Sequence, residues 1–157
     1  MRKISLFIAM SLDGYIADSK GSVNWLQGQG DGEDMDTYSE FIKDVDTILM
    51  GWNTYHQIVT ELSPDKWIYH DFITYVITHN EETSSEKIRF VNKNLADLIK
   101  SLKKEKGKDI WICGGANLVQ QLVNQDFIDR YHITIIPTLL GSGVRLFKNA
   151  EHEVKLR

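Results

Sequence analysis

Short apolar runs alternate with segments of helical periodicity along the whole chain. Several of these runs are apolar at consecutive positions, which is the pattern of strands covered on both faces of a sheet. The runs that we predict as strands are Ile4–Met10, Thr47–Met50, Phe72–Thr78, Ile88–Val91, Ile110–Cys113, Tyr131–Ile136 and Val144–Phe147. Because strands of this kind alternate with helices, the sequence predicts an α/β fold with a largely parallel sheet.

Three segments between the predicted strands carry apolar residues at helical spacing. The first spans Asp36–Val45, the second follows Asn94, which is a favourable helix N-cap, and the third begins at about Asn117. Their apolar stripes are, in this order, Tyr38, Phe41, Ile42 and Val45; Leu95, Leu98, Ile99 and Leu102; and Leu118, Val119, Leu122 and Val123. The sequence shows no internal repeat and no linker, so we expect one domain over residues 1–157.

Two of the predicted strands end in glycine and lead directly into a helical pattern. Residues 110–119 turn at Gly114 and Gly115, and residues 48–55 turn at Gly51, followed by Thr54, which can cap a helix. Glycine lets the backbone approach a ligand without a Cβ clash, and a helix N-terminus favours an anion. Each turn alone is also what a simple strand-to-helix connection requires. Together they predict a dinucleotide that lies across the edge of the sheet.

Composition and charge argue against several classes of protein. The chain is 42% hydrophobic and 25% charged, as is usual for a soluble globular protein, and its net charge of −4 argues against nucleic-acid binding. No apolar run is long enough to span a membrane, and the N-terminus lacks a signal-peptide cleavage site. The single Cys113 excludes an internal disulfide, and the five histidines lack metal-ligand spacing. We therefore expect a cytoplasmic protein without a metal site, a membrane partner or a nucleic-acid partner.

Five segments of the chain carry a family pattern, in a fixed order. They are residues 9–17 (Ala-Met-Ser-Leu-Asp-Gly-Tyr-Ile-Ala), 48–55 (Ile-Leu-Met-Gly-Trp-Asn-Thr-Tyr), 75–79 (Tyr-Val-Ile-Thr-His), 110–116 (Ile-Trp-Ile-Cys-Gly-Gly-Ala) and 135–147 (Ile-Ile-Pro-Thr-Leu-Leu-Gly-Ser-Gly-Val-Arg-Leu-Phe). This set resembles the dihydrofolate-reductase-like fold, in particular the reductase domain of riboflavin biosynthesis and its small stand-alone bacterial relatives. The resemblance implies a three-layer α-β-α fold and an oxidoreductase that transfers a hydride from NADPH to a small heterocycle.

The resemblance also implies a set of cofactor-binding residues at matching positions. Backbone groups of Ala9 and Ile16 would hold the nicotinamide carboxamide, although plain core packing explains the side chains of Ala9, Ile16 and Leu118 equally well. The other positions are Gly51, Trp52, Asn53 and Thr54 near the adenosine-side phosphates, Thr78, His79 and Asn80 near the adenine ribose, and Gly114, Gly115, Ala116, Asn117 and Leu118 at the pyrophosphate.

One departure from the family pattern concerns the choice between NADPH and NADH. Relatives often place a basic residue directly after the Met-Gly pair, where this chain has Trp52. A dianionic phosphate is held best by Arg or Lys, so we expect Trp52 to stack on adenine and Lys87 or Arg89 to reach the phosphate. NADPH is the expected cofactor, and NADH stays an open alternative.

The substrate side of the resemblance requires a carboxylate on the helix after the first loop. Asp36 lies nearest to that position and Asp34 next, although such acids also suit a helix N-terminus simply by their charge. Trp25 corresponds to a loop that closes over the nicotinamide, or else it is an aromatic residue packed on its own loop. Asp13 precedes Gly14, and we interpret it as a turn residue.

The substrate itself is predicted only as pyrimidine- or pterin-like. The chain lacks the Asp-Asp-Pro-type segment that helps the riboflavin enzyme to hold a ribose phosphate, so 5-amino-6-(5-phosphoribosylamino)uracil reductase activity is one candidate among several. A non-catalytic nucleotide-binding module that retains the fold is the alternative. Relatives continue through one more strand, so either the final strand of the sheet is missing or the sequence is truncated. We expect a homodimer.

Overall fold

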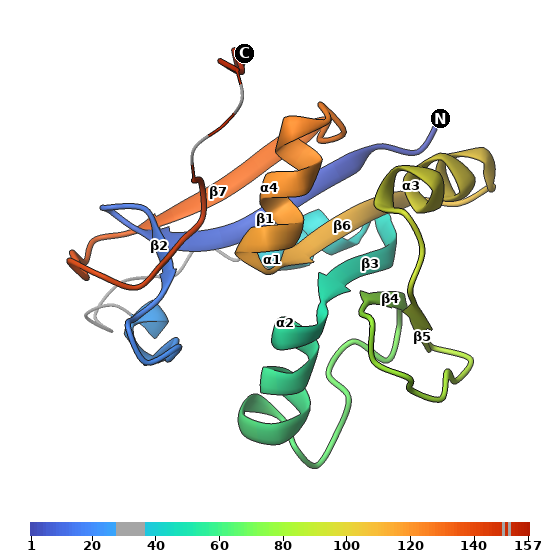
Figure 1. Cartoon of the computed structure of the whole chain (residues 1–157), viewed down its shortest axis with the longest axis horizontal. Helices are drawn as coiled ribbons and strands as arrows, with labels where there is room; N and C mark the ends of the chain where they lie inside the picture. Colours follow the sequence, from blue (N-terminus) through green and yellow to red (C-terminus); the bar gives the residue numbers. More distant parts are fainter. Residues whose placement is uncertain (28–36, 149, 151) are drawn as a thin grey trace.

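A parallel six-stranded β-sheet runs through the molecule (Figure 1). The computed structural model describes residues 1–27, 37–148, 150 and 152–157. The strand order is β5-β4-β3-β6-β1-β7, and every neighbouring pair in this sheet is parallel. The strands are β1 (Ile4–Ser11), β3 (Val45–Gly51), β4 (Ile73–Ile77), β5 (Ile88–Val91), β6 (Asp109–Gly114) and β7 (Arg130–Ile136). The predicted α/β class with a parallel central sheet is confirmed.

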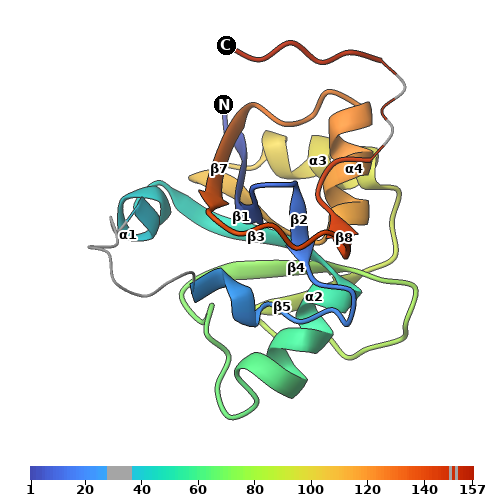
Figure 2. The same ribbon diagram turned by 90° about the vertical axis from the view of Figure 1, so that its left-hand side faces the viewer.

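Helices cover both faces of the sheet, which gives three layers (Figure 2). On one face lie α3 (Leu95–Lys104) and α4 (Ala116–Asn124). On the other lie α1 (Thr37–Ile42) and α2 (Trp52–Gln57), and α2 continues into a π-helical turn, η2 (Ile58–Leu62). A short 3₁₀ helix, η1 (Asn24–Gln27), follows the first loop.

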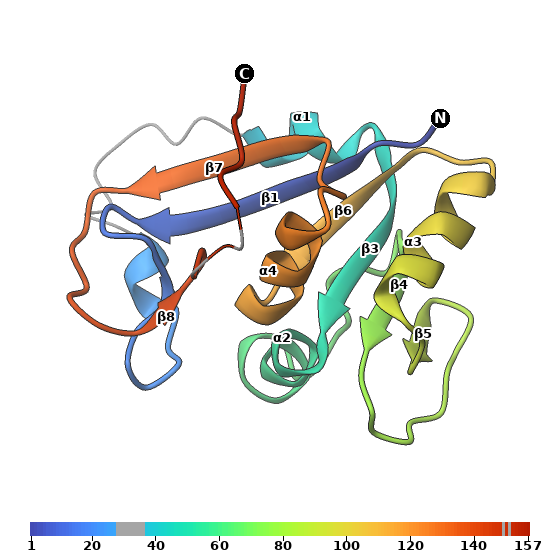
Figure 3. The same cartoon turned by 45° about the horizontal axis from the view of Figure 1, so that its top comes forward.

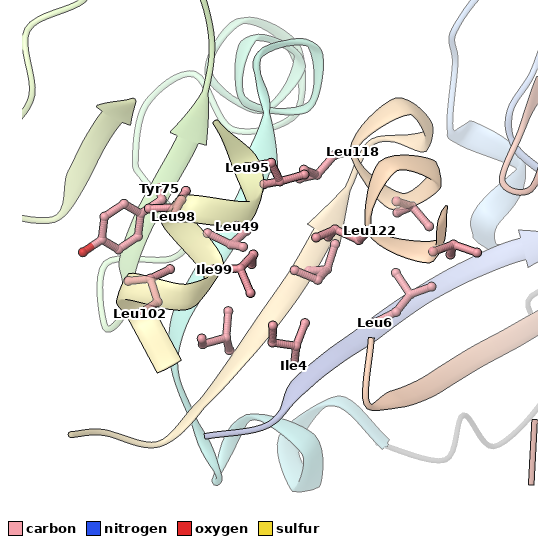
Figure 4. Close-up of a cluster of buried hydrophobic side chains, with 14 of the residues drawn as sticks. Ile4, Leu6, Leu49, Tyr75, Leu95, Leu98, Ile99, Leu102, Leu118 and Leu122 are labelled. Atoms are coloured by element: carbon pink, nitrogen blue, oxygen red, sulfur yellow. The ribbon is translucent and has the colours of Figure 1, made fainter. Parts of the chain in front are cut away.

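The main core lies between the sheet and the α3–α4 layer. Figure 4 shows side chains from these two helices converging on the strands beneath them. The residues with no exposed surface include Leu6, Leu49, Ile99, Ile112 and Leu122. Burial of such a side chain contributes about 1.5–3 kcal/mol. The apolar stripes predicted after Asn94 and from about Asn117 are therefore the faces that attach both helices.

The opposite face of the sheet is mainly aromatic. Trp111 of β6 is buried at its centre. Five rings surround it with centroids 5.4–6.4 Å away, namely Phe7, Tyr38, Phe41, Tyr69 and Phe72. We call this group the Trp111 cluster. It joins α1 and the segment before β4 to the sheet.

Two short strands form a separate antiparallel pair, β2 (Tyr15–Ala17) with β8 (Val144–Arg145). The predicted strand Val144–Phe147 is therefore shorter than expected and lies outside the main sheet, because the fully buried Leu146 turns into the core while its N–H donates to the Gly14 carbonyl. The three-residue β2 has no counterpart among the strands predicted from the sequence. The described residues beyond Arg145 form no further helix or strand.

Two predicted details of the helices were wrong. The first helix ends at Ile42, because Val45 is a buried residue of β3. Thr54 does not cap α2, since the helix begins directly after Gly51 and Thr54 lies inside it. The last helix begins at Ala116, which agrees with the predicted start at about Asn117.

Candidate functional site

The carboxyl ends of β3 and β6 meet at the middle of one sheet edge (Figure 3). From there, the connections leave in opposite directions: β3 leads through α2 to β4, and β6 leads through α4 past β1 to β7. The two helices consequently lie on opposite faces of the sheet. In open α/β sheets, ligands bind at such a reversal, outside the carboxyl ends of the strands.

The two glycine turns predicted from the sequence are in contact at this edge. A Cβ atom on Gly51 would lie 3.8 Å from the backbone nitrogen of Gly115. Gly114 has φ of +142°, a conformation that side-chain-bearing residues rarely adopt, and the Gly114–Gly115 peptide is cis. The structure thus brings together the two turns that are far apart in the sequence.

Both helices that leave these turns begin without a side-chain cap. The N-cap residues of α2 and α4 are Gly51 and Gly115, and no side chain in the described part of the chain accepts from their first N–H groups. In contrast, the Asn94 side chain caps α3 by accepting from the N–H groups of Ala96 and Asp97. The uncapped N–H groups and the positive ends of two helix dipoles therefore favour an anion at the shared edge.

Thr54 lies against the glycine pair. Its Oγ1 atom is 3.5 Å and 3.3 Å from the positions that Cβ atoms on Gly114 and Gly115 would occupy. A larger residue at Gly115 would press on this hydroxyl, so the close approach of the two segments favours glycine there. The Thr54 side chain is half-buried, with its hydroxyl directed to the edge rather than to the helix cap that we had expected.

The side chains of the other positions around these turns already have protein contacts. Ala116 and Leu118 are buried in the core, so only their backbone faces outward, and the Asn117 side chain accepts from Gln121. Trp52 stacks on His56 of the next helical turn, with centroids 5.6 Å apart. Asn53 is exposed.

The end of β4 provides the next part of the edge. Thr78 is buried, and its hydroxyl accepts from the N–H of Asn80, which shapes the turn. The His79 ring is exposed, and its Nδ1 atom lies 2.7 Å from Oδ1 of Asn92. These residues follow the strand next to β3, as their predicted place beside the ribose requires. Arg89, which with Lys87 was one of two candidates to reach a phosphate, donates to the Tyr75 hydroxyl at 2.9 Å.

On the other side of the glycine pair, β1 separates from β6. Their register ends at Leu6 and Ile112, whereas β1 stays paired with β7 up to Ser11. Ala9 lies on the part of β1 that has left β6, and Ile16 follows on β2, half-buried against the main core. The sheet is therefore open between β1 and β6 at the same edge as the two turns.

Two weakly acidic groups lie on the aromatic face below this opening. The Cys113 thiol donates to the Tyr69 hydroxyl, with 3.8 Å between sulfur and oxygen. Burial raises the pKa of the Cys113 thiol to about 11, and burial together with the nearby Cys113 raises the pKa of Tyr69. Both groups stay protonated at neutral pH. Cys113 is consequently a poor nucleophile, although the residue keeps some exposed surface.

The catalytic residues predicted from the sequence are only partly covered by the structure. Asp34 and Asp36 lie outside the described residues. Trp25 lies in η1, half-buried, and its indole N–H donates to the Ser22 carbonyl at 3.1 Å. The indole therefore fixes its own loop, and its proposed part in closing over a ligand stays a prediction.

Sequence reasoning missed the part that Asp13 plays beside the opening. Its carboxylate accepts from the Ser11 hydroxyl at 2.6 Å and from the N–H groups of Leu140 and Gly141 at 3.1 and 2.8 Å. The Ser11 hydrogen bond, helped by these two backbone donors, lowers the pKa of Asp13 to about 2. The only signal in the sequence was an acid beside glycine, which simple turns also show.

These features define an α/β protein in which two glycine turns meet at one edge of the sheet. The RibD C-terminal domain family matches residues 2–157, so the chain belongs to that family. The uncharacterized protein YwjB of Bacillus subtilis is 42% identical over 99% of this chain and 88% of its own length, and YyaP of the same organism is 31% identical over 99% and 86%.

Solved structures agree with this assignment. A Shewanella sp. PV-4 protein named for riboflavin biosynthesis has a TM-score of 0.83 at 31% identity, covering 98% of this chain and 87% of that one. The Thermotoga maritima diaminohydroxyphosphoribosylaminopyrimidine deaminase/5-amino-6-(5-phosphoribosylamino)uracil reductase scores 0.67 at 16% identity, covering 99% and 50%. Enterococcus faecalis dihydrofolate reductase scores 0.63 at 14% identity, covering 95% and 79%. The last two comparisons show that the fold is dihydrofolate-reductase-like.

Within the described ranges, no helix has both the length and the apolar character needed to cross a membrane, and no group of three or more potential metal ligands comes together.

Proposed function

We propose that this chain is a reductase that binds NADPH across the carboxyl edge of its sheet and reduces a small, flat heterocycle. The observation that carries the proposal is the meeting of two uncapped helix N-termini at the contact between Gly51 and Gly115. Two anion-favouring positions side by side suit a pyrophosphate-linked dinucleotide. Family membership favours NADPH, and NADH is the competing cofactor because Trp52 stands where a basic residue often lies.

The residues at the edge fit this cofactor. The glycines keep the backbone accessible, since a Cβ on Gly115 would fill space beside Thr54. Backbone N–H groups of Trp52 to Thr54 and of Ala116 to Leu118 would hold the phosphates. Ala9 and Ile16, beside the opening between β1 and β6, would hold the nicotinamide end, and Thr78, His79 and Asn80 would border the adenine ribose.

When bound, the reduced nicotinamide supplies a hydride, and the substrate must also gain a proton. The chain positions the substrate and supplies polar groups on its aromatic face. Asp36, with Asp34 next, stays our candidate for the carboxylate that shifts the substrate's protonation. A pyrimidine- or pterin-like ring would suit the rings of the Trp111 cluster, and 5-amino-6-(5-phosphoribosylamino)uracil is one such substrate to test.

A turnover assay tests this function against the non-catalytic alternative. Oxidation of NADPH and of NADH is followed across a panel of pyrimidines and pterins, with the Asp36→Asn variant as control. We expect substrate-dependent oxidation that Asp36→Asn reduces by at least tenfold, while cofactor affinity stays unchanged. NADPH binding without turnover of any compound supports a nucleotide-binding module instead, and the absence of binding to either cofactor overturns both readings.

The cofactor part of the proposal has its own matched pair of variants. Thr54→Val removes the hydroxyl beside the glycine pair and keeps the side-chain shape, whereas Thr60→Val makes the same change further along the chain, where the hydroxyl donates to the His56 carbonyl. Loss of one hydrogen bond of about 1.4 kcal/mol weakens NADPH binding about tenfold. We expect this loss, measured by calorimetric titration, for Thr54→Val and no change for Thr60→Val. Equal affinities in both variants would contradict the placement of the cofactor.

A further inference from the structure

Two of the sequence segments that mark the family lie against each other beside the ligand edge. Residues 12–17 and residues 138–146 are joined by the antiparallel pair β2–β8. Two further backbone hydrogen bonds connect them, from the Leu12 N–H to the Thr138 carbonyl at 2.9 Å and from the Leu146 N–H to the Gly14 carbonyl at 3.0 Å. The proposed function assigns a role to the first segment through Ile16, and none to the second.

The two segments approach each other very closely. A Cβ on Gly143, whose φ is +139°, would clash with the carbonyl oxygen of Ala17, so only glycine fits there. The Arg145 guanidinium lies over the Tyr15 ring, 4.8 Å from its centroid. The position of β2 is consequently set by the later segment, and not by its own short sequence.

Asp13 is the side chain that fastens the later segment. One of its oxygens, Oδ1, accepts from the Ser11 hydroxyl and from the Leu140 N–H, while Oδ2 accepts from the Gly141 N–H. The Ser11 hydroxyl in turn accepts from the N–H of Tyr15, the first residue of β2. A single carboxylate thus connects the end of β1, the start of β2 and the loop before β8.

We propose that Asp13 is a positioning residue that fixes the backbone around Ile16 for the nicotinamide end of the cofactor. This inference depends on the proposed function. In this proposal, Asp13 does not contact the cofactor. It fixes the position of residues 138–146, and these residues in turn fix the position of β2.

The variant Asp13→Asn tests the proposal, because an amide has the shape of the carboxylate but only one acceptor oxygen. Whichever way the amide is turned, its NH₂ group faces either the Leu140 N–H or the Gly141 N–H, so one donor loses its partner. The matched control is Asp129→Asn, since Asp129 also accepts a backbone N–H, that of Ile4, at the opposite end of β1.

The measurement compares two ligands by calorimetric titration: NADPH and 2′-phospho-ADP-ribose, which lacks only the nicotinamide, with NADH and ADP-ribose in parallel. We expect Asp13→Asn to weaken NADPH about tenfold and to leave 2′-phospho-ADP-ribose within about twofold. Asp129→Asn should leave the ratio of the two affinities unchanged. Ser11→Ala, which removes one donor to Asp13 and keeps the carboxylate, should give the same selective loss to a smaller degree, and it replaces Asp13→Asn if that variant does not fold.

The outcomes separate this proposal from the function on which it depends. Equal loss for both ligands, or no loss, overturns the positioning role of Asp13 and leaves the proposed cofactor in place. A wild-type protein that binds neither NADPH nor NADH overturns the proposed function itself.

Discussion

The thiol of Cys113 and the phenol of Tyr69 show how burial decides the chemistry of a side chain. Cys113 immediately precedes the glycine pair, a place where a reactive thiolate would attack ligands. Burial raises the pKa of the thiol from an ordinary 9.0 to about 11, and this effect outweighs the opposing effect of the hydrogen bond with Tyr69. The site therefore presents a neutral S–H group on its aromatic face.

This pKa predicts slow labelling of Cys113 in the native protein. A pKa raised from 9.0 to about 11 lowers the thiolate fraction at pH 7.5 about hundredfold. Because a less acidic thiol is a stronger nucleophile once ionised, reaction with a disulfide reagent should be roughly tenfold slower than in the unfolded chain. Because the folded pKa lies above the unfolded one, the thiol stabilises the fold below pH 9, and this contribution is lost as the pH rises towards 11. Absorbance at 412 nm with the Ellman reagent follows the reaction, and Cys113→Ala gives the baseline. Rapid stoichiometric labelling of native protein at pH 7.5 contradicts the prediction.

At the scale of elements, local patterns in the sequence gave correct predictions. Short apolar runs predicted all six strands of the main sheet, and apolar stripes at helical spacing predicted α3 and α4. Elements that depend on distant partners were missed or shortened. Three-residue β2 exists only through its pairing with β8, and Asp13 binds backbone 127 residues away, which no local pattern encodes.

The same contrast between local patterns and distant contacts explains which parts of the candidate site could be predicted from the sequence. Its glycine turns were predictable, because an apolar strand that ends in glycine before a helical stripe is a local signal. That the turns touch each other depends on β3 and β6 being neighbours, although β4 and β5 lie between them in the sequence and pair on the other side of β3. Thr54 was misread as a cap for a related reason: its hydroxyl faces the turn of another strand.

The helix caps give a prediction at this scale. Among the N-cap residues of α2, α3 and α4, only Asn94 accepts backbone N–H groups with its side chain. The stability of α3 should therefore fall when that side chain is shortened. Asn94→Ala should lower the free energy of unfolding by about 1 kcal/mol, as measured by urea denaturation. Asn94→Asp keeps an acceptor oxygen and should lose less than half of that amount. An unchanged midpoint of urea denaturation for Asn94→Ala would mean that the cap contributes nothing to the free energy of unfolding.

At the scale of the whole molecule, one buried cation connects segments that are distant in sequence. Arg2 donates to Asp46 at 2.7 Å, to the Thr47 hydroxyl at 2.6 Å, and to the carbonyls of Leu102 and Lys108 at 3.1 and 2.6 Å. It thereby ties the N-terminus to β3, to the end of α3 and to the turn before β6. Its place in the chain, before the first apolar run, gave no sign of this role.

Removal of this guanidinium leaves several acceptors without a donor. Arg2→Ala should therefore lower the free energy of unfolding by about 3 kcal/mol. The neighbouring Lys3→Ala is the control, because Lys3 is exposed and surface changes of this kind stay within about 0.5 kcal/mol. Urea denaturation of the two variants measures both values. Similar midpoints would show that the Arg2 contacts do not contribute to stability.

The outer edge of the sheet motivates a prediction about assembly. β7 pairs with β1 on one side, and no described strand pairs with its other side. Exposed apolar side chains gather nearby in the sequence, at Ile135, Leu139, Val144 and Phe147. We expect a homodimer, because a second copy would cover such an edge. Sedimentation velocity at micromolar concentration tests this, with Ile135→Lys expected to favour the monomer; a wild-type monomer would contradict it.

The short ladder between β1 and β6 has a mechanical consequence. Since the two strands share a register only from Ile4 to Leu6, the β1–β7 ribbon is hinged to the rest of the sheet near its amino end. We expect small rotations about these three residues to change the separation of β1 and β6 at their carboxyl ends while the paired residues stay in register. Such a tilt would let the edge of the sheet accept rings of different thickness without repacking the core.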